Sequence, residues 1–467
     1  MSETLRIFSG GHVVLPTGVQ SVDIVTRSGK IIAIGDSGPI SAPAERIDLK
    51  GLTVLPGAID PHLHLGHGKD ISRPRVAADA AQETAAAAVG GVTTFIPYLM
   101  ATEPFSTIFD DVVAITHAGS RIDFGYHFIV STEAQLAEVP DAIAKYGVPS
   151  FKIFMNNRGG EGARLGLPDI DDGFLFRLCE AAAKHGGIVC PHPETIEIAW
   201  VLRNREKARD PDGRGGLPVW NASRPDFVEA DAVQRSAYLA RVTGTNIYIV
   251  HTSSEAALEA ALMQRRAGAA ITIETCPHYL THDETFERGT VGKINPPLRS
   301  RRDCDALWKA IIDGHVDTVG TDHVHRDLSG KSPSVWDASP GCPGLETMLP
   351  VMLSEGHVKR GIPLERISAL TAKNAARSLG LGHCKGAIAI GMDADFAIVD
   401  PKARWTLDQS HIKSSAGYSI YEGAIFTGKV VHTVVRGKFV YRDNVLVESA
   451  VGTGTYVRRS KQAQIVA

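Results

Sequence analysis

The middle of the chain, residues 56–382, alternates short apolar runs with longer segments that read as helices. Short runs without polar alternation are typical of strands that are buried on both faces of a parallel sheet. Asp171 can begin one of the helices and Gly186 can end it. Either Ser253 or Ser254 can cap another. The alternation predicts parallel βα units, and therefore an α/β fold.

The two ends of the chain have a different pattern, in which short strands follow one another through turns. Residues 22–35 alternate apolar and polar positions around a turn at Ser28-Gly29-Lys30, which predicts a hairpin. The same pattern of short strands and turns returns after about residue 385. We therefore expect one small β-sandwich domain built from residues 1–55 and 383–450, beside the α/β domain. The polar and basic tail, 451–467, is expected to be disordered or to lie on another subunit.

Charge and composition narrow the class of protein. A formal net charge of −3 on 467 residues offers no global attraction for nucleic acid or for a membrane surface. No apolar stretch reaches the ~18 residues of a membrane-spanning helix, and the N-terminus lacks the pattern of a secretory signal. The six cysteines are dispersed without a CxxC pair, as in proteins of reducing compartments. These features predict a cytoplasmic enzyme.

Residues that can bind metal ions stand at the downstream ends of several apolar runs. In a (β/α)8 barrel all strands end at one face, so side chains at these positions converge on one site. The set contains four histidines, one lysine and one aspartate: His62, His64, Lys152, His192, His251 and Asp322. Taken singly, a lone histidine more often packs in a core, and an aspartate after a strand more often caps a helix. Their shared position favours a metal site on a barrel.

Lys152 is the most informative member of this set. A charged lysine inside an apolar strand is costly, unless its side chain extends to solvent. Burial lowers the pKa of a lysine, and its neutral amine can then add CO₂ to give a carbamate. Such a carboxylate can bridge two metal ions, and Zn²⁺ accepts a mixture of imidazole and oxygen ligands. The pattern therefore indicates a two-metal hydrolase.

Several motifs in this order resemble those of the cyclic amidohydrolases, which include hydantoinase, dihydropyrimidinase, dihydroorotase and allantoinase. They are DPHLHL, SFKIF, ETCPHYL, PPLR and GTDH. The segment around residues 222–254 especially resembles hydantoinase and dihydropyrimidinase. The resemblance spans nearly the whole chain. It implies a TIM barrel with a β-sandwich from both termini, a homotetramer and a small-molecule substrate.

The resemblance also implies a role for each candidate ligand. The ligands would be His62, His64 and Asp322 for the more buried ion, His192 and His251 for the more exposed ion, and carbamylated Lys152 between the two. A hydroxide bridging the ions would attack the ring carbonyl. Asp322 would take the proton from the bridging water and return it to the departing ring nitrogen, as general base and then general acid.

The residues expected to hold the ring depart from the family pattern. Gly66 stands where dihydroorotases have an arginine for the substrate carboxylate, which disfavours dihydroorotate although KINPPLR is closer to dihydroorotase. Asn157 stands where hydantoinases usually have an oxyanion-binding tyrosine. Pro340 and Asn295 are expected to contact the ring through the main chain. Three further histidines near these motifs are expected to be solvated loop residues: His67, His323 and His325.

We therefore expect a hydrolase that opens a cyclic amide, imide or ureide of the hydantoin or dihydropyrimidine type. Allantoin, dihydroorotate-like rings and other cyclic imides remain alternatives. A non-catalytic scaffold of the dihydropyrimidinase-like kind is disfavoured because every ligand position holds a ligand-type residue.

Overall fold

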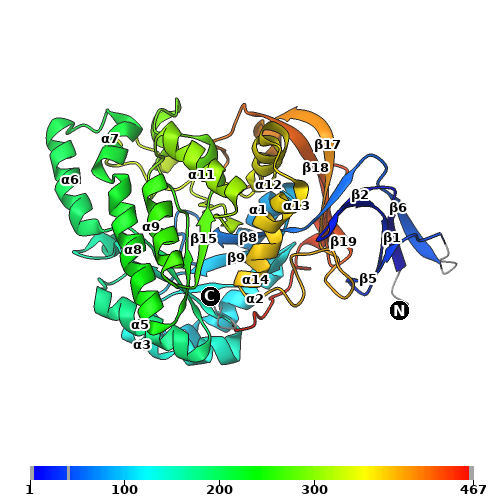
Figure 1. Cartoon of the computed structure of the whole chain (residues 1–467), viewed down its shortest axis with the longest axis horizontal. Helices are drawn as coiled ribbons and strands as arrows, with labels where there is room; N and C mark the ends of the chain where they lie inside the picture. Colours follow the sequence, from blue (N-terminus) through cyan, green and yellow to red (C-terminus); the bar gives the residue numbers. More distant parts are fainter. Residues whose placement is uncertain (1–4, 39–42, 462–467) are drawn as a thin grey trace.

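The computed structural model describes residues 5–38 and 43–461, and its centre is a parallel barrel (Figure 1). The barrel strands are β8 (Ala58–Leu63), β9 (Val92–Leu99), β10 (Asp123–Phe124), β11 (His127–Ile129), β12 (Ser150–Phe154), β13 (Ile188–His192), β14 (Asn246–Ile249), β15 (Ile271–Thr275) and β16 (Thr318–Val319). β10 and β11 pair with opposite ends of β9 and together act as one interrupted strand. A bridge between Leu63 and His323 brings the first strand to the segment after the last. The predicted barrel is confirmed.

Apolar strands and capped helices build this barrel. Every residue of β9 is buried, as expected for a strand covered on both faces. The helices are α1 (Ala77–Val89), α2 (Phe109–Gly119), α3 (Glu133–Ala137), α4 (Val139–Asp141), α5 (Asp172–His185), α6 (Ile196–Arg209), α7 (Gly216–Ser223), α8 (Asp226–Thr243), α9 (Glu255–Arg266), α10 (Pro277–Thr281), α11 (Arg301–Asp313), α12 (Met348–Val351), α13 (Leu364–Ser368) and α14 (Asn374–Ser378). Asp171 caps α5 and Ser254 caps α9, each accepting from a backbone N–H. Gly186 ends α5 with a φ of 79°.

Two sheets formed from both ends of the chain lie on one side of the barrel, as the blue and orange strands of Figure 1 show. Their strands are β1 (Leu5–Ser9), β2 (His12–Leu15), β3 (Gly18–Ser21), β4 (Asp23–Arg27), β5 (Lys30–Gly35), β6 (Ala44–Asp48), β7 (Thr53–Pro56), β17 (Phe396–Thr406), β18 (Ile425–Val435), β19 (Lys438–Arg442) and β20 (Val445–Leu446). One sheet has the order β5-β4-β1-β6 and the other β20-β19-β18-β17-β7-β2-β3. β7 and β17 pair antiparallel, which joins the two ends. The predicted hairpin is β4–β5, turning through Ser28 and Gly29.

The described part of the tail, 451–461, lies against the barrel of its own chain. Tyr456 forms a bridge with Phe124 in β10. Arg459 is only 4% exposed, and its guanidinium donates to Ser150 Oγ at 2.7 Å and to the carbonyl of Tyr126. Our expectation of a disordered tail is therefore wrong for these residues, because one aromatic and one arginine anchor a segment that is otherwise polar, while its contact with another subunit stays a prediction. Residues 462–467 lie outside the described part of the chain.

Candidate active site

The candidate ligands meet at the carboxyl end of the barrel. β8 carries His62 and leads into His64, β12 carries Lys152, and β13 ends at His192. The loops after β14 and β16 carry His251 and Asp322. All six line one pocket with a volume of about 100 Å³. Strand ends that were far apart in the sequence are thereby brought together, as a barrel requires.

Three of these residues form a compact cluster that fits a metal ion. The ligand atoms of His62, His64 and Asp322 all lie within 4.8 Å of one another. Asp322 Oδ1 is 3.2 Å from Nε2 of His62 and 3.8 Å from Nε2 of His64. Imidazole and carboxylate together suit a borderline-soft ion such as Zn²⁺. Beside this cluster, His251 Nε2 lies 2.9 Å from His192 Nδ1, so a second pair of imidazoles is in contact.

Lys152 lies among these imidazoles and does not reach solvent. Lys152 is only 1% exposed. Its Nζ is 3.4 Å from His62 Nε2 and 4.6 Å from the centre of the Tyr98 ring. Among the described residues, no carboxylate forms an ion pair with it. Burial lowers the pKa of Lys152, with Asp322 opposing the shift. The amine is therefore poised to lose its proton.

Burial also fixes the charge of the other groups. It lowers the pKa of His64 to about 3, and it lowers the pKa of His192 and His251 as well. Burial pushes the pKa of Asp322 upward, but His62, His251 and His64 more than offset this and hold it well below its ordinary value. For His62, burial also pushes the pKa downward, but Glu274 and Asp322 outweigh it and raise the pKa. Apart from His62, the pocket thus presents imidazoles with a lowered pKa beside an ionised carboxylate, which are the protonation states of metal ligands.

Two of the candidate ligands have unusual backbone geometry. His251 has a φ of 40° and Asp322 a φ of 48°, in the left-handed region that residues with a Cβ rarely adopt. Such conformations cost on the order of 1–3 kcal/mol each and persist where the surrounding structure demands them. The barrel therefore holds these two side chains in orientations that the chain alone would not favour.

Two buried glutamates support the imidazoles, and our sequence reasoning missed both. Glu274, on β15, places Oε1 2.6 Å from His62 Nδ1 and accepts from the backbone N–H of His251 at 2.9 Å. Glu194 places Oε2 2.8 Å from His192 Nε2 and is paired with Arg224 at 2.8 Å. Carboxylates in this position fix the tautomer and orientation of metal-binding histidines. The available signal was an acidic residue inside an apolar strand, or two positions after a histidine.

The residues expected to contact the ring also line the pocket: Asn157, Asn295 and Pro340. Asn156 joins them, and the side-chain oxygens of Asn156 and Asn295 are buried without a hydrogen-bond partner in the described structure. Gly66 has a clear steric role, since a Cβ there would lie 1.9 Å from the carbonyl oxygen of Asp70. The position therefore excludes the arginine found in dihydroorotases.

The three additional histidines divide into two kinds. His67 keeps an exposed side chain next to Asp79, as expected. His323 is fully buried, with Nε2 2.9 Å from a carboxylate oxygen of Glu83, and His325 is 4% exposed. The expectation of solvated loop residues is therefore wrong for His323 and His325, because the segment after β16 turns inward to close the barrel.

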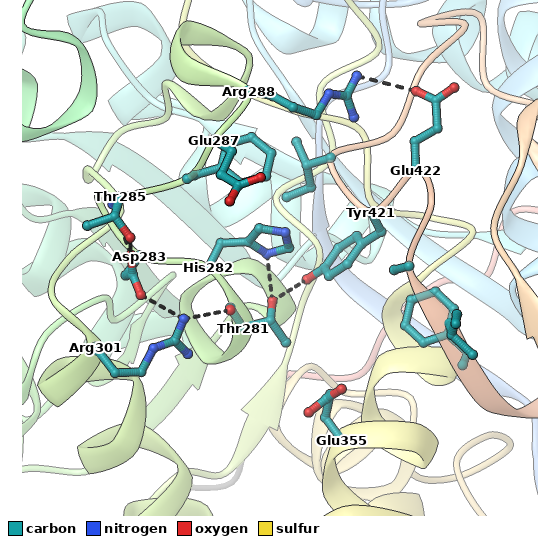
Figure 2. A pocket seen from close by; sticks show the side chains of 15 residues that line it. Thr281, His282, Asp283, Thr285, Glu287, Arg288, Arg301, Glu355, Tyr421 and Glu422 are labelled. Atoms are coloured by element: carbon teal, nitrogen blue, oxygen red, sulfur yellow. Dashed lines mark hydrogen bonds and ion pairs between the residues drawn. The ribbon is translucent and has the colours of Figure 1, made fainter.

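A second, wider pocket lies apart from this site, where α10 and its following loop face residues 420–426 (Figure 2). Its volume is about 500 Å³. Its charged side chains pair with one another, Arg288 with Glu422 at 3.3 Å and Arg301 with Asp283 at 2.6 Å. Both arginines of this wider pocket therefore have carboxylate partners.

No described helix is long and apolar enough to cross a membrane. The model of the amidohydrolase family matches residues 53–440. Over 94% of its length the chain is 35% identical to the allantoinase of Deinococcus radiodurans, of which it covers 95%. It is 32% identical to the D-hydantoinase of Geobacillus stearothermophilus, over 99% of this chain and 98% of that protein. The crystal structure of dihydropyrimidinase from Brevibacillus agri superposes with a TM-score of 0.89 at 29% identity, covering 98% of this chain and all of that one. The chain therefore belongs to the amidohydrolase family, as a cyclic amidohydrolase of the hydantoinase, dihydropyrimidinase and allantoinase kind.

Proposed function

We propose that this enzyme opens the amide bond of a hydantoin or dihydropyrimidine ring with the help of two divalent metal ions, most simply Zn²⁺. The observation that carries the proposal is Lys152, a buried lysine without a carboxylate partner in the described structure, which shares its pocket with the four candidate imidazoles. A structural lysine in such a place would need a counter-charge. Reaction with CO₂ converts the lysine into a negatively charged carbamate, which needs no carboxylate as a counter-charge.

The ligand set would divide between two ions: His62, His64 and Asp322 for one, His192 and His251 for the other, and modified Lys152 for both. When bound, such ions lower the pKa of a water and polarise the ring carbonyl. Lys152 would form a bond from Nζ to the carbon of CO₂ and release one proton, which leaves a carbamate with a single negative charge. The low pKa that burial gives the lysine makes the required neutral amine accessible.

Asp322 would move the proton during ring opening. Its pKa lies well below the ordinary value despite burial, so it is ionised when the substrate binds. It would accept the proton of the attacking water and deliver it to the ring nitrogen as the amide bond breaks. Both transfers use one carboxylate, which the barrel holds in place although the backbone at residue 322 lies in the left-handed region.

Asparagine side chains would hold the ring. A cyclic ureide alternates N–H donors and carbonyl acceptors, and an asparagine amide offers both kinds of group. Asn156, Asn157 and Asn295 line the pocket, and two of their oxygens lack partners in the described residues. In place of the expected tyrosine, an amide N–H of Asn156 or Asn157 would donate to the developing oxyanion. Allantoin, which contains a hydantoin ring, is the second candidate, because an allantoinase is 35% identical to this chain.

The first test is ring opening by protein loaded with zinc and treated with bicarbonate. The panel contains dihydrouracil, hydantoin, 5-substituted hydantoins, allantoin, dihydroorotate and succinimide. Turnover of dihydrouracil or a hydantoin is expected. Turnover of allantoin alone would shift the assignment to the second candidate, and turnover of none by protein with two bound metal ions would overturn the proposal.

The second test addresses Lys152 directly. Lys152→Ala should lose metal and activity, and a short-chain carboxylic acid should restore part of both by replacing the carbamate. Metal content is measured together with ring opening, so that metal loss and catalytic loss are separated. Activity in the variant equal to that of the wild type would remove Lys152 from the mechanism.

A further inference from the structure

Two arginines stand at the active-site pocket without a role in the mechanism above. Arg164 belongs to the short 3₁₀ helix at Glu161–Leu165, in the loop after β12, and Arg326 belongs to the loop after β16. Both line the same pocket as Lys152 and Asp322. The side chain of Arg164 is exposed and that of Arg326 is half-buried, so both can meet a ligand that enters.

Neither arginine forms an ion pair with a carboxylate in the part of the chain that the structure describes. Arg326 donates only to the carbonyl of Lys69, at 3.1 Å, and Arg164 has no hydrogen bond among the described residues. The third arginine of the pocket, Arg224, is paired with Glu194 at 2.8 Å. The arginines of the wider pocket in Figure 2 are paired as well. Two unpaired guanidinium groups at one pocket are thus a distinguishing feature of this site.

The acidic residues near these two arginines already have other partners. Glu161 accepts from Arg203 at 2.6 Å and from the indole N–H of Trp200 at 2.8 Å. Asp70 faces Arg75 at 3.6 Å. Burial lowers the pKa of Arg326, and the positive charge of Arg164 lowers it further. Asp70 acts on Arg326 and Glu161 on Arg164 in the opposite direction, but neither carboxylate forms an ion pair with these arginines in the described structure. An anion bound between the two guanidinium groups would relieve their repulsion.

We infer that Arg164 and Arg326 bind a carboxylate on the substrate, so that the preferred ring is a hydantoin or related cyclic ureide with an acidic substituent. This inference rests on the function proposed above and specifies its substrate. Guanidinium groups match the geometry of a carboxylate and form charge-assisted hydrogen bonds with it. Arginines on two different loops would grip the substituent outside the metal cluster, while the asparagines hold the ring.

The test compares 5-(carboxymethyl)hydantoin with its neutral amide, 5-(carbamoylmethyl)hydantoin, which has nearly the same shape. The wild-type enzyme should show a kcat/KM for the acid that is roughly ten- to a hundredfold higher, the range that hydrogen bonds to a charged group supply. Arg164→Gln and Arg326→Gln should each reduce kcat/KM for the acid about tenfold and change that for the amide less than twofold. Added salt should reduce the preference.

Arg177→Gln is the matched control, because Arg177 is a surface arginine on α5 that pairs with Glu133 outside the pocket. It should leave the acid preference unchanged. Similar kcat/KM values for acid and amide in the wild type would overturn the inference and leave the proposed function standing.

A readout without catalysis separates the two proposals. Titration calorimetry on metal-free protein measures the affinity for each compound when no ring opens. If no compound in the panel is hydrolysed, the proposed function fails, and calorimetry still decides this inference. Tighter binding of the acid that both arginine variants abolish would support it, and equal affinities for acid and amide would overturn it.

Discussion

Replacing Glu274 with glutamine tests how far the metal site depends on residues that are not ligands. The carboxylate of Glu274 accepts from His62 Nδ1 at 2.6 Å, from the His251 N–H at 2.9 Å and from the Tyr248 hydroxyl at 2.9 Å. Glutamine has the same shape, and its single carbonyl oxygen can serve the first two donors, which share Oε1. Its amide NH₂ would then face Tyr248, whose hydroxyl can turn to donate to Thr318 Oγ1, 2.6 Å away. The substitution therefore removes charge while preserving the contacts.

Loss of such a supporting carboxylate typically weakens metal binding 10- to 100-fold, or about 1.4–2.8 kcal/mol. Because glutamine keeps the hydrogen bonds, we expect Glu274→Gln to weaken binding about tenfold and Glu274→Ala to approach a hundredfold. The assay is competition with a chromophoric chelator, with metal per chain measured in parallel. Glu229→Gln is the control, since Glu229 is a buried glutamate that contacts Ser253 and Arg299 but no ligand imidazole. Unchanged affinity in Glu274→Gln, or an equal loss in the control, would refute the reasoning.

Three further predictions concern stability. Burial lowers the pKa of Lys293 to about 7, so between pH 7 and its unfolded pKa near 10.5 only the unfolded chain holds the proton. The free energy of unfolding should therefore increase with rising pH in this range, by up to about 1.4 kcal/mol per pH unit. In urea unfolding, the Lys293→Met variant should lack this pH dependence. The same pH dependence of the unfolding free energy in the wild type and in Lys293→Met would contradict this prediction. Arg299→Met should lose about 3–5 kcal/mol in the free energy of unfolding, because Glu229 is left buried without its partner at 3.0 Å, and adding Glu229→Gln should recover part of the loss. A double variant no more stable than the single one would count against the pair. Gly454→Ala would place a Cβ 1.9 Å from the Ile122 carbonyl oxygen. Thermal stability should therefore fall by the equivalent of about 1–3 kcal/mol, and the tail should become open to proteolysis. A variant that resists proteolysis as well as the wild type would argue against the docked tail.

The barrel and the convergence of its polar strand ends could be predicted from the sequence because both follow from local patterns. An apolar run of a few residues specifies a buried parallel strand, and parallel strands end at the same face. His62 and Asp322 stand at such ends, so their meeting needed no knowledge of loops. The β-sandwich was predictable for a similar reason, since the alternation around Ser28-Gly29 specifies a hairpin.

Contacts between side chains from distant strands could not be predicted in this way. Glu274 reaches His62 because only β16 separates β15 from β8 where the barrel closes, and no spacing in the sequence records that approach. Arg164 and Arg326 meet at one pocket because two loops of unrelated sequence fold over it. The tail was misjudged because its binding depends on Tyr456 and Arg459 finding partners on distant segments of the barrel.

The docking of that tail has a consequence for the order in which the protein is made. A ribosome completes β8 through β16 long before it reaches Arg459, yet Arg459 supplies hydrogen bonds to Tyr126 and Ser150 at the base of those strands. β17 likewise reaches its partner β7 only after the whole barrel has emerged. Folding during translation therefore leaves the barrel unsealed at its base and the sandwich half built until the last strands and the tail are released. The segment 56–382, expressed by itself, would remain at that unfinished stage.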